Sequence, residues 1–251
     1  MSEAITEDAL LGGRVQLRQP AVGYRVAIDP VLLAAAVPAA AGEQVLDVGA
    51  GVGAAALCLV ARLPGVRAFG IEMQPALVRL AGENVALNEV GGRVDVMLGD
   101  LGDPPPRLAA GSFDHVMANP PFAEPGRGTP PRRLSTAVAT VESGPGLRLW
   151  LSFCLRMTRP RGTVTVIHRA DRLAALLTCL AEHGGGVTVY PLWPDATGRK
   201  PAKRVILRIQ KGVAAPVRLM PGLVLHRPDG AFTEAAETVL RHAGALDLIP
   251  A

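Results

Sequence analysis

The chain has few cysteines, and no two of them have the spacing of a metal-binding or redox motif. Each cysteine lies in an apolar helical pattern, and no histidine clusters with it. We therefore expect buried thiols in a reducing compartment and no metal site. The cysteines are Cys58, Cys154 and Cys179.

Long apolar runs are missing as well. The longest candidates are interrupted by Glu43 and Arg62, so none reaches the length of a membrane-spanning helix. Residues 1–8 are acidic and polar, unlike a secretory signal or a transit peptide. The chain has 251 residues, 49% of them hydrophobic, which is enough for a large core. We expect a single cytoplasmic domain over 1–251, with an N-terminal extension to about residue 42 and a C-terminal tail from about residue 213.

Acidic residues are scarce in two stretches of the second half. Between residues 127 and 169 only Glu142 is acidic, against eight arginines, and residues 199–227 contain no acid. Such a surface suits a polyanion, and we expect it to bind nucleic acid. The alternative is an ordinary solvated face in an arginine-rich composition. The residues assigned to RNA contact are Arg199, Lys200, Lys203 and Arg204.

The chain does contain a regular alternation of apolar strands and helices. Strands are expected at 45–48, 68–72, 94–98, 113–118 and 162–168, and helices at 54–61, 75–88, 147–158 and 171–183. This order predicts a doubly wound, mostly parallel α/β sheet of seven strands, which binds its ligand at the carboxyl ends of the strands.

The two ends of the chain are patterned less strongly. A short strand is expected at 14–17, and Asp29 is placed to cap a helix with Pro30 in its first turn. After the core we expect an antiparallel edge pair of strands at 187–192 and 204–209. A hairpin is expected around 220–225 and a last helix at 233–242.

The first strand ends in a glycine-rich turn that differs from the dinucleotide fingerprint. The turn, Asp47 to Gly53, lacks the spacing GxGxxG and carries an acid before its glycines. Its glycines allow backbone N–H groups to approach a ligand at a helix N-terminus. A carboxylate there would repel a pyrophosphate, but it suits an ammonium or a sulfonium. Glu72 ends the next strand, about 20 residues on, where a carboxylate can bind a ribose hydroxyl pair.

Two consecutive prolines end the strand at 113–118. Neither has an N–H to donate, so the chain must leave the sheet rigidly. The following proline biases Asn119 toward an extended backbone, which holds its carboxamide at the strand end beside carbonyls that lack ladder partners. These acceptors suit an amino group, and Phe122 suits a planar ring; the alternative is a plain strand-ending turn. The residues assigned to catalysis are Asn119, Pro120, Pro121 and Phe122.

Together these residues resemble the class I S-adenosylmethionine-dependent methyltransferases. Asn119 to Phe122 matches the catalytic motif of the amino methyltransferases, which act on exocyclic amines of adenine or guanine or on the glutamine amide of release factors. The resemblance implies S-adenosylmethionine as cofactor. The cofactor-binding residues that it implies are Asp47, Gly49, Gly51, Gly53, Glu72, Asp100 and Leu101.

Within this class, residues 19–212 resemble the bacterial tRNA adenine-N6 methyltransferases that modify the adenine next to the anticodon of valine tRNA. The similarity includes Gly23 to Asp29 and Pro201 to Val205, and it implies tRNA as partner. A ribosomal guanine-N2 methyltransferase stays open. A release-factor methyltransferase would carry a helical domain ahead of the glycine turn, and O-methylation needs a base or metal that the tetrapeptide lacks. The non-enzymatic alternative is an RNA-binding module with this fold.

Several other residues receive structural interpretations. We expect His115 and His168 to be structural and the tryptophans Trp150 and Trp193 to be packing anchors. The stretch 123–146 is rich in proline, glycine and arginine, which is typical of a lid or a disordered loop.

Overall fold

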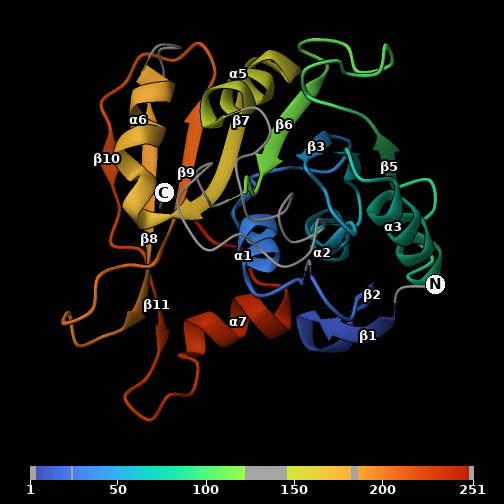
Figure 1. Ribbon diagram of the computed structural model, residues 1–251. Coiled ribbons are helices and arrows are strands. Elements are labelled where there is room, and N and C mark those ends of the chain that lie inside the picture. The colour runs from blue at the N-terminus through green and yellow to red at the C-terminus, as the bar shows by residue number, and fades with distance from the viewer. Residues whose placement is uncertain (1–3, 24, 122–145, 182–185, 249–251) are drawn as a thin grey trace.

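A long, mostly parallel sheet with helices on both faces forms the frame of the protein (Figure 1). The structure, a computed structural model, describes residues 4–23, 25–121, 146–181 and 186–248. Five neighbouring strands are parallel, in the order β7-β6-β3-β4-β5. They are β3 (Gln44–Val48), β4 (Arg67–Glu72), β5 (Val94–Leu98), β6 (Phe113–Ala118) and β7 (Thr158–Arg169). The predicted α/β fold is confirmed.

An antiparallel strand continues the sheet beyond β7. This strand, β9 (Arg204–Gln210), is antiparallel to both β7 and β8 (Val187–Asp195), which confirms the predicted antiparallel pair. The pair does not form the edge, because β10 (Arg218–Leu219) and β11 (Leu223–His226) lie beyond β8 and give the sheet nine strands within the described residues. The expectation of seven strands is therefore wrong.

The two last strands do not form the hairpin expected around residues 220–225. Each of them instead pairs in parallel with β8, one after the other along its length. Gly222 lies between them with φ +83°, and a Cβ on it would lie 2.1 Å from the carbonyl oxygen of Pro191. The chain thus stays against β8 at this point, and it does not turn back on itself.

Helices bury a separate hydrophobic core on each face of the sheet. One core contains α1 (Asp29–Ala36), α2 (Ala54–Arg62), α3 (Pro75–Leu87) and α7 (Glu234–His242), and the other contains α5 (Leu147–Met157) and α6 (Leu173–Ala181). Side chains alternate between the faces along each strand. In β3, Val45 faces the first core, whereas Leu46 and Val48 face the second. Asp47 therefore points toward the face that carries α2.

The beginning of α1 differs from the sequence expectation. The N-cap is Ile28, and Asp29 is the first helical residue with Pro30 behind it, so the predicted capping role of Asp29 is wrong. Its carboxylate instead accepts a hydrogen bond from Nε of Arg204 in β9, at 2.8 Å. The Asp29 carboxylate thus binds the guanidinium of a distant strand and not the backbone N–H groups of its own helix. In α7 the expected start is confirmed, since Thr233 accepts from the Ala236 N–H at 3.1 Å.

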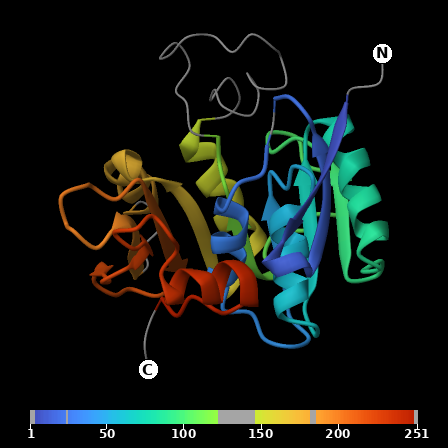
Figure 2. The same cartoon turned by 90° about the horizontal axis from the view of Figure 1, so that it is seen from below.

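An N-terminal hairpin lies beside α3 (Figure 2) and is attached to it by Asn84 of that helix and by Asn88, its C-cap. The strands β1 (Ile5–Leu10) and β2 (Val15–Pro20) pair antiparallel, so the strand expected at 14–17 is one arm of this hairpin. The side chain of Asn84 accepts from Arg18 N at 2.7 Å and donates to Arg18 O at 2.9 Å. Asn88 makes the same two bonds with Gln16, at 2.8 and 2.7 Å. Four residues apart at the end of α3, the two side-chain amides bond the β2 backbone as a neighbouring strand would.

We expect Asn84→Ala to destabilise the protein much more than Asn88→Ala. Asn84 is fully buried and also donates to the carbonyl of Val52 in the glycine turn, at 3.0 Å. Its loss leaves three backbone groups unpaired, and leaving such a group unpaired costs about 1–3 kcal/mol. Urea unfolding should show a loss of at least about 2 kcal/mol for Asn84→Ala and less than about 1 kcal/mol for the half-buried Asn88. Equal losses would mean that the link to the glycine turn adds nothing.

Candidate active site

The carboxyl ends of the parallel strands bring the predicted site residues to one edge of the sheet. Val48 pairs with Ile71 on one side and with Ala118 on the other. The residues that follow them, Gly49, Glu72 and Asn119, therefore leave three neighbouring strands at the same level. Such an edge is where open α/β sheets bind their ligands.

The glycine turn is held against β4 by backbone hydrogen bonds. The N–H groups of Gly49 and Ala50 both donate to the carbonyl oxygen of Ile71, at 2.8 and 3.1 Å. The N–H of Gly51 donates to Oε2 of Glu72 at 3.0 Å, and the other carboxylate oxygen accepts from Gln74 N at 2.9 Å. Glu72 is 7% exposed, so it fixes the turn from within.

Three positions of the turn have a backbone conformation that favours glycine. The three predicted glycines have positive φ values, of +71°, +57° and +83° at Gly49, Gly51 and Gly53. A Cβ on Gly49 would lie 2.4 Å from Cη2 of Trp150 in α5. The indole therefore packs directly on the turn, a contact between residues 101 positions apart that the sequence did not reveal.

Asp47 lies under the turn and is 3% exposed. Its Oδ2 has no hydrogen-bond partner among the described residues. Burial raises the pKa of Asp47 to about 7, and the nearby Glu72 adds to this, although the Ala56 N–H at the start of α2 opposes it. A cation placed near this oxygen would lower the pKa and relieve the cost of burying the charge.

Asn119 presents a second buried oxygen at the same edge. The residue is half-buried, yet its Oδ1 is inaccessible to water and lacks a hydrogen-bond partner within the described part of the chain. Pro120 is buried behind it and Pro121 is half-buried, while Phe122 lies outside the described residues. An acceptor left without a donor in this way suits an incoming N–H group.

His168 supports the two prolines from the neighbouring strand. Ala118 pairs with Val166, so Pro120 lies level with His168, which is fully buried. Burial lowers the pKa of His168 to about 4, although the nearby backbone of Arg169 and Pro121 favours its protonated form. A neutral imidazole thus packs beside the point where the chain leaves the sheet.

The third predicted acid lies at the end of β5. Glu72 pairs with Leu98, which places Asp100 two residues beyond the same edge. The Asp100 side chain is exposed and its Oδ1 accepts from Gly102 N at 2.7 Å, while Leu101 is buried. The carboxylate thus stabilises its own loop.

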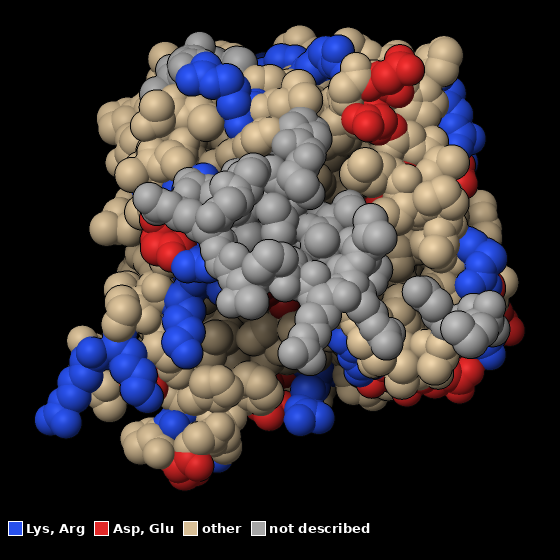
Figure 3. All heavy atoms as spheres, viewed as in Figure 1, with Lys and Arg blue, Asp and Glu red and all other residues tan. Residues whose placement is uncertain are grey.

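The predicted RNA-binding cations have different surroundings, and lysine and arginine gather near the lower left of Figure 3. Arg204 is bound to Asp29, and Lys200 to Asp195 at 3.0 Å. Arg199 and Lys203 are exposed. Arg204 therefore has a structural contact that the sequence did not indicate.

Two other expectations concern metals and membranes. Within residues 4–23, 25–121, 146–181 and 186–248, no cluster of three histidine, cysteine or acidic side chains is arranged to hold a metal ion. In the same residues, no helix has both the length and the apolar character needed to cross a bilayer. Cys58 and Cys154 are buried as expected, and Cys179 is half-buried.

Comparison with known proteins agrees with this geometry. Residues 24–143 match the family model described as methyltransferase small domain. The tRNA1(Val) (adenine(37)-N6)-methyltransferase of Aeromonas hydrophila is 28% identical over 84% of this chain and 86% of its own length. The enzyme of the same name from Porphyromonas gingivalis is 32% identical over 63% of this chain and 64% of its own.

Solved structures show the same fold. A predicted O-methyltransferase from Agrobacterium tumefaciens has a TM-score of 0.72 at 22% identity, covering 87% of this chain and 98% of that one. A geranyl diphosphate C-methyltransferase from Streptomyces coelicolor has a TM-score of 0.54 at 14% identity, covering 72% and 76%. The chain therefore has the fold of the class I methyltransferases and is similar in sequence to the methyltransferase small domain and to the tRNA1(Val) adenine-N6 methyltransferases.

Proposed function

We propose that the protein transfers the methyl group of S-adenosylmethionine to an exocyclic amine, namely N6 of an adenine in tRNA. The observation that carries this proposal is the buried oxygen of Asn119, which lacks a partner within the described residues at the edge where the glycine turn leaves the sheet. The names of the relatives support tRNA as substrate, and such an enzyme would act in the cytoplasm.

The residues at this edge fit the cofactor. The turn contains three glycines with positive φ, and the carboxylate of Asp47 before them has one oxygen without a hydrogen-bond partner among the described residues. We assign Gly49, Gly51 and Gly53 to the turn around the cofactor and Glu72 to its ribose, with Asp100 and Leu101 beside its adenine. Asp47 favours the positive charge of the cofactor by electrostatic attraction. When bound, the cofactor supplies an activated methyl group.

Asn119 and the carbonyl of Pro120 act on the substrate amine. An exocyclic adenine amine is a poor nucleophile because its lone pair is delocalised into the ring. Two acceptors that bind its two hydrogens would favour a pyramidal nitrogen and so direct its lone pair toward the activated methyl group that the bound cofactor would supply. Most of the rate comes from positioning. We assign Pro121 to keeping the acceptors rigid and Phe122 to stacking on the base, a contact worth about 1–3 kcal/mol.

The direct test uses labelled S-adenosylmethionine with three substrates in parallel. These are an unmodified tRNA transcript pool, purified release factors and ribosomal RNA. We expect label in tRNA, recovered as N6-methyladenosine after nucleoside analysis. If the label is found in ribosomal guanine or in a release factor, that molecule is the substrate and the proposal of tRNA is wrong. Cofactor binding without transfer to any of the three would favour the RNA-binding module.

We expect Asn119→Ala to reduce methyl transfer at least about a hundredfold, the usual loss when a group that stabilises the transition state is removed. The cofactor dissociation constant should change less than about twofold, since Asn119 is assigned to the amine. Single-turnover transfer and calorimetry measure the two effects. The control is Asn88→Ala, at an asparagine remote from this edge. Full activity in Asn119→Ala would exclude the tetrapeptide from the mechanism.

Asp47 should make cofactor binding pH-dependent. Its pKa is raised to about 7, so below pH 7 the free protein carries a proton that a cationic ligand must displace. Affinity should therefore rise with pH, by roughly fivefold between pH 6 and 7, where the ligand's ammonium stays charged. Calorimetry of the parent and of Asp47→Asn measures the cofactor affinity at each pH, and the affinity of the variant should not change with pH.

A comparison with S-adenosylhomocysteine identifies the charged group of the ligand that Asp47 attracts, because S-adenosylhomocysteine has the ammonium but lacks the sulfonium. If both ligands show the same pH dependence, Asp47 acts on the ammonium. A pH dependence that survives in Asp47→Asn would assign the titration to another group.

A further inference from the structure

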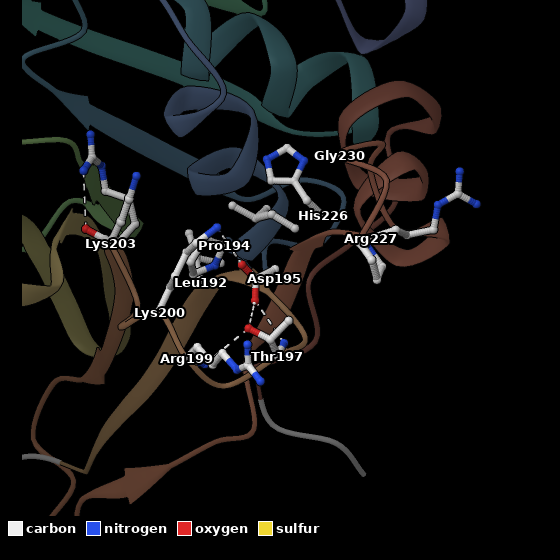
Figure 4. A pocket seen from close by; sticks show the side chains of 13 residues that line it. Leu192, Pro194, Asp195, Thr197, Arg199, Lys200, Lys203, His226, Arg227 and Gly230 are labelled. Atoms are coloured by element: carbon white, nitrogen blue, oxygen red, sulfur yellow. Dashed lines mark hydrogen bonds and ion pairs between the residues drawn. The ribbon is translucent and has the colours of Figure 1, made fainter.

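A basic pocket lies between the β8–β9 turn and the C-terminal tail (Figure 4). Its volume is about 730 Å³, and 13 residues line it. One wall is the turn from Pro194 to Arg204, and the other is the segment from Leu225 to Gly230. Residues about thirty positions apart thus face the same cavity. The matched family model ends at residue 143, so it does not include this pocket.

The lining of the pocket is strongly cationic. Its basic residues are Arg199, Lys200, Lys203, Arg204 and Arg227, and its one acid is Asp195. Asp195 is bound by Lys200 and by the Thr197 N–H and hydroxyl, which hold its pKa down to about 2. The acid therefore stays ionised and orders the turn, and an excess of positive charge remains around the cavity.

The tail contributes an arginine whose partner is weakly held. Arg227 lies 3.4 Å from Asp229, and both side chains are more than half exposed, at 57% and 62%. Exposed pairs of this kind contribute little, so a phosphate can displace the carboxylate. Beside Arg227, His226 stacks on Phe232 with ring centroids 4.8 Å apart, which fixes this wall.

The strand directions place the pocket on the active-site edge. β8 is antiparallel to β9 and therefore parallel to β7, so Asp195, the last residue of β8, lies at a carboxyl end on the same side of the sheet as Asn119. β11 is parallel to β8, with His226 opposite Asp195. Arg204, the first residue of the antiparallel β9, lies at the same edge, lines the pocket and binds Asp29 at the start of α1.

We propose that this pocket binds backbone phosphates of the RNA whose base enters the active site, with Lys203 and Arg227 contacting them from its two walls. This inference rests on the proposed function. It adds the C-terminal tail, and Arg227 in particular, to the RNA-binding surface. A phosphodiester chain suits the pocket because it offers repeated single charges that exposed cations can bind without deep desolvation.

The test is the salt dependence of binding to a tRNA transcript. We expect Lys203→Ala and Arg227→Ala each to weaken binding roughly tenfold at low salt and to reduce the slope of log K against log salt by about one. In the methylation assay the KM for tRNA should rise while kcat stays, because these contacts are remote from the reacting atoms. Asp229→Asn should tighten binding by freeing Arg227.

A matched ion pair elsewhere provides the control. Arg107 and Asp95 lie 3.7 Å apart with 59% of each side chain exposed, and Asp95 belongs to β5 at the opposite end of the sheet. Arg107→Ala and Asp95→Asn make the same charge changes and should leave the tRNA affinity within about twofold of the parent.

The outcomes separate the pocket from the proposed function. If Arg227→Ala and Arg107→Ala have equal effects, only net charge matters and the pocket proposal is wrong. If tRNA is methylated but neither pocket variant changes its binding, the pocket proposal also fails, and an acidic protein becomes the ligand to test. If tRNA binds with the expected dependence on the pocket but is not methylated, the pocket proposal holds and the proposed function fails.

Discussion

The carbonyl oxygen of Ile71 is the acceptor on which the site depends. It receives the N–H groups of both Gly49 and Ala50, so the chain must turn sharply at the end of β3 and stay beside β4. This turn requires positive φ at its glycines and brings the Gly51 N–H to the carboxylate of Glu72, the next residue of β4. One backbone acceptor thus fixes the turn and its acid together, before any ligand binds.

Two buried oxygens at this edge have no partner among the described residues, one on Asp47 and one on Asn119. Each carries a cost, because an unpaired buried acceptor loses its hydrogen bond to water. The two differ in charge. The carboxyl group responds by a raised pKa, whereas the amide cannot titrate and keeps its acceptor at every pH. The edge therefore has one oxygen that favours a cation and one that favours a neutral N–H donor, which are the two groups that methyl transfer to an amine must bring together.

The features that were predicted correctly from the sequence are those that a local sequence pattern determines. The strand and helix order, the glycine turn and Thr233 before α7 all follow from residues close in the chain. The errors concern contacts between distant residues. Asp29 looks like a helix cap until Arg204, 175 positions away, provides a charged donor. The tail looks like a hairpin because no local signal shows that β8 still has a free edge. Trp150 on Gly49 was hidden for the same reason.

The basic stretch 199–227 shows that the number of charges in a sequence does not tell which of them are available to a ligand. Its eight cations look equivalent in the sequence, but several are used inside the protein. Arg208 donates to the carbonyl of Ala36 at the end of α1, and Lys211 to that of Thr158. Burial lowers the pKa of Arg208 to about 10, which marks it as part of the interior. Arg204 is tied to Asp29. A polyanion therefore meets a few cations around one pocket and not a uniform basic strip, so binding depends on where those cations point more than on their number.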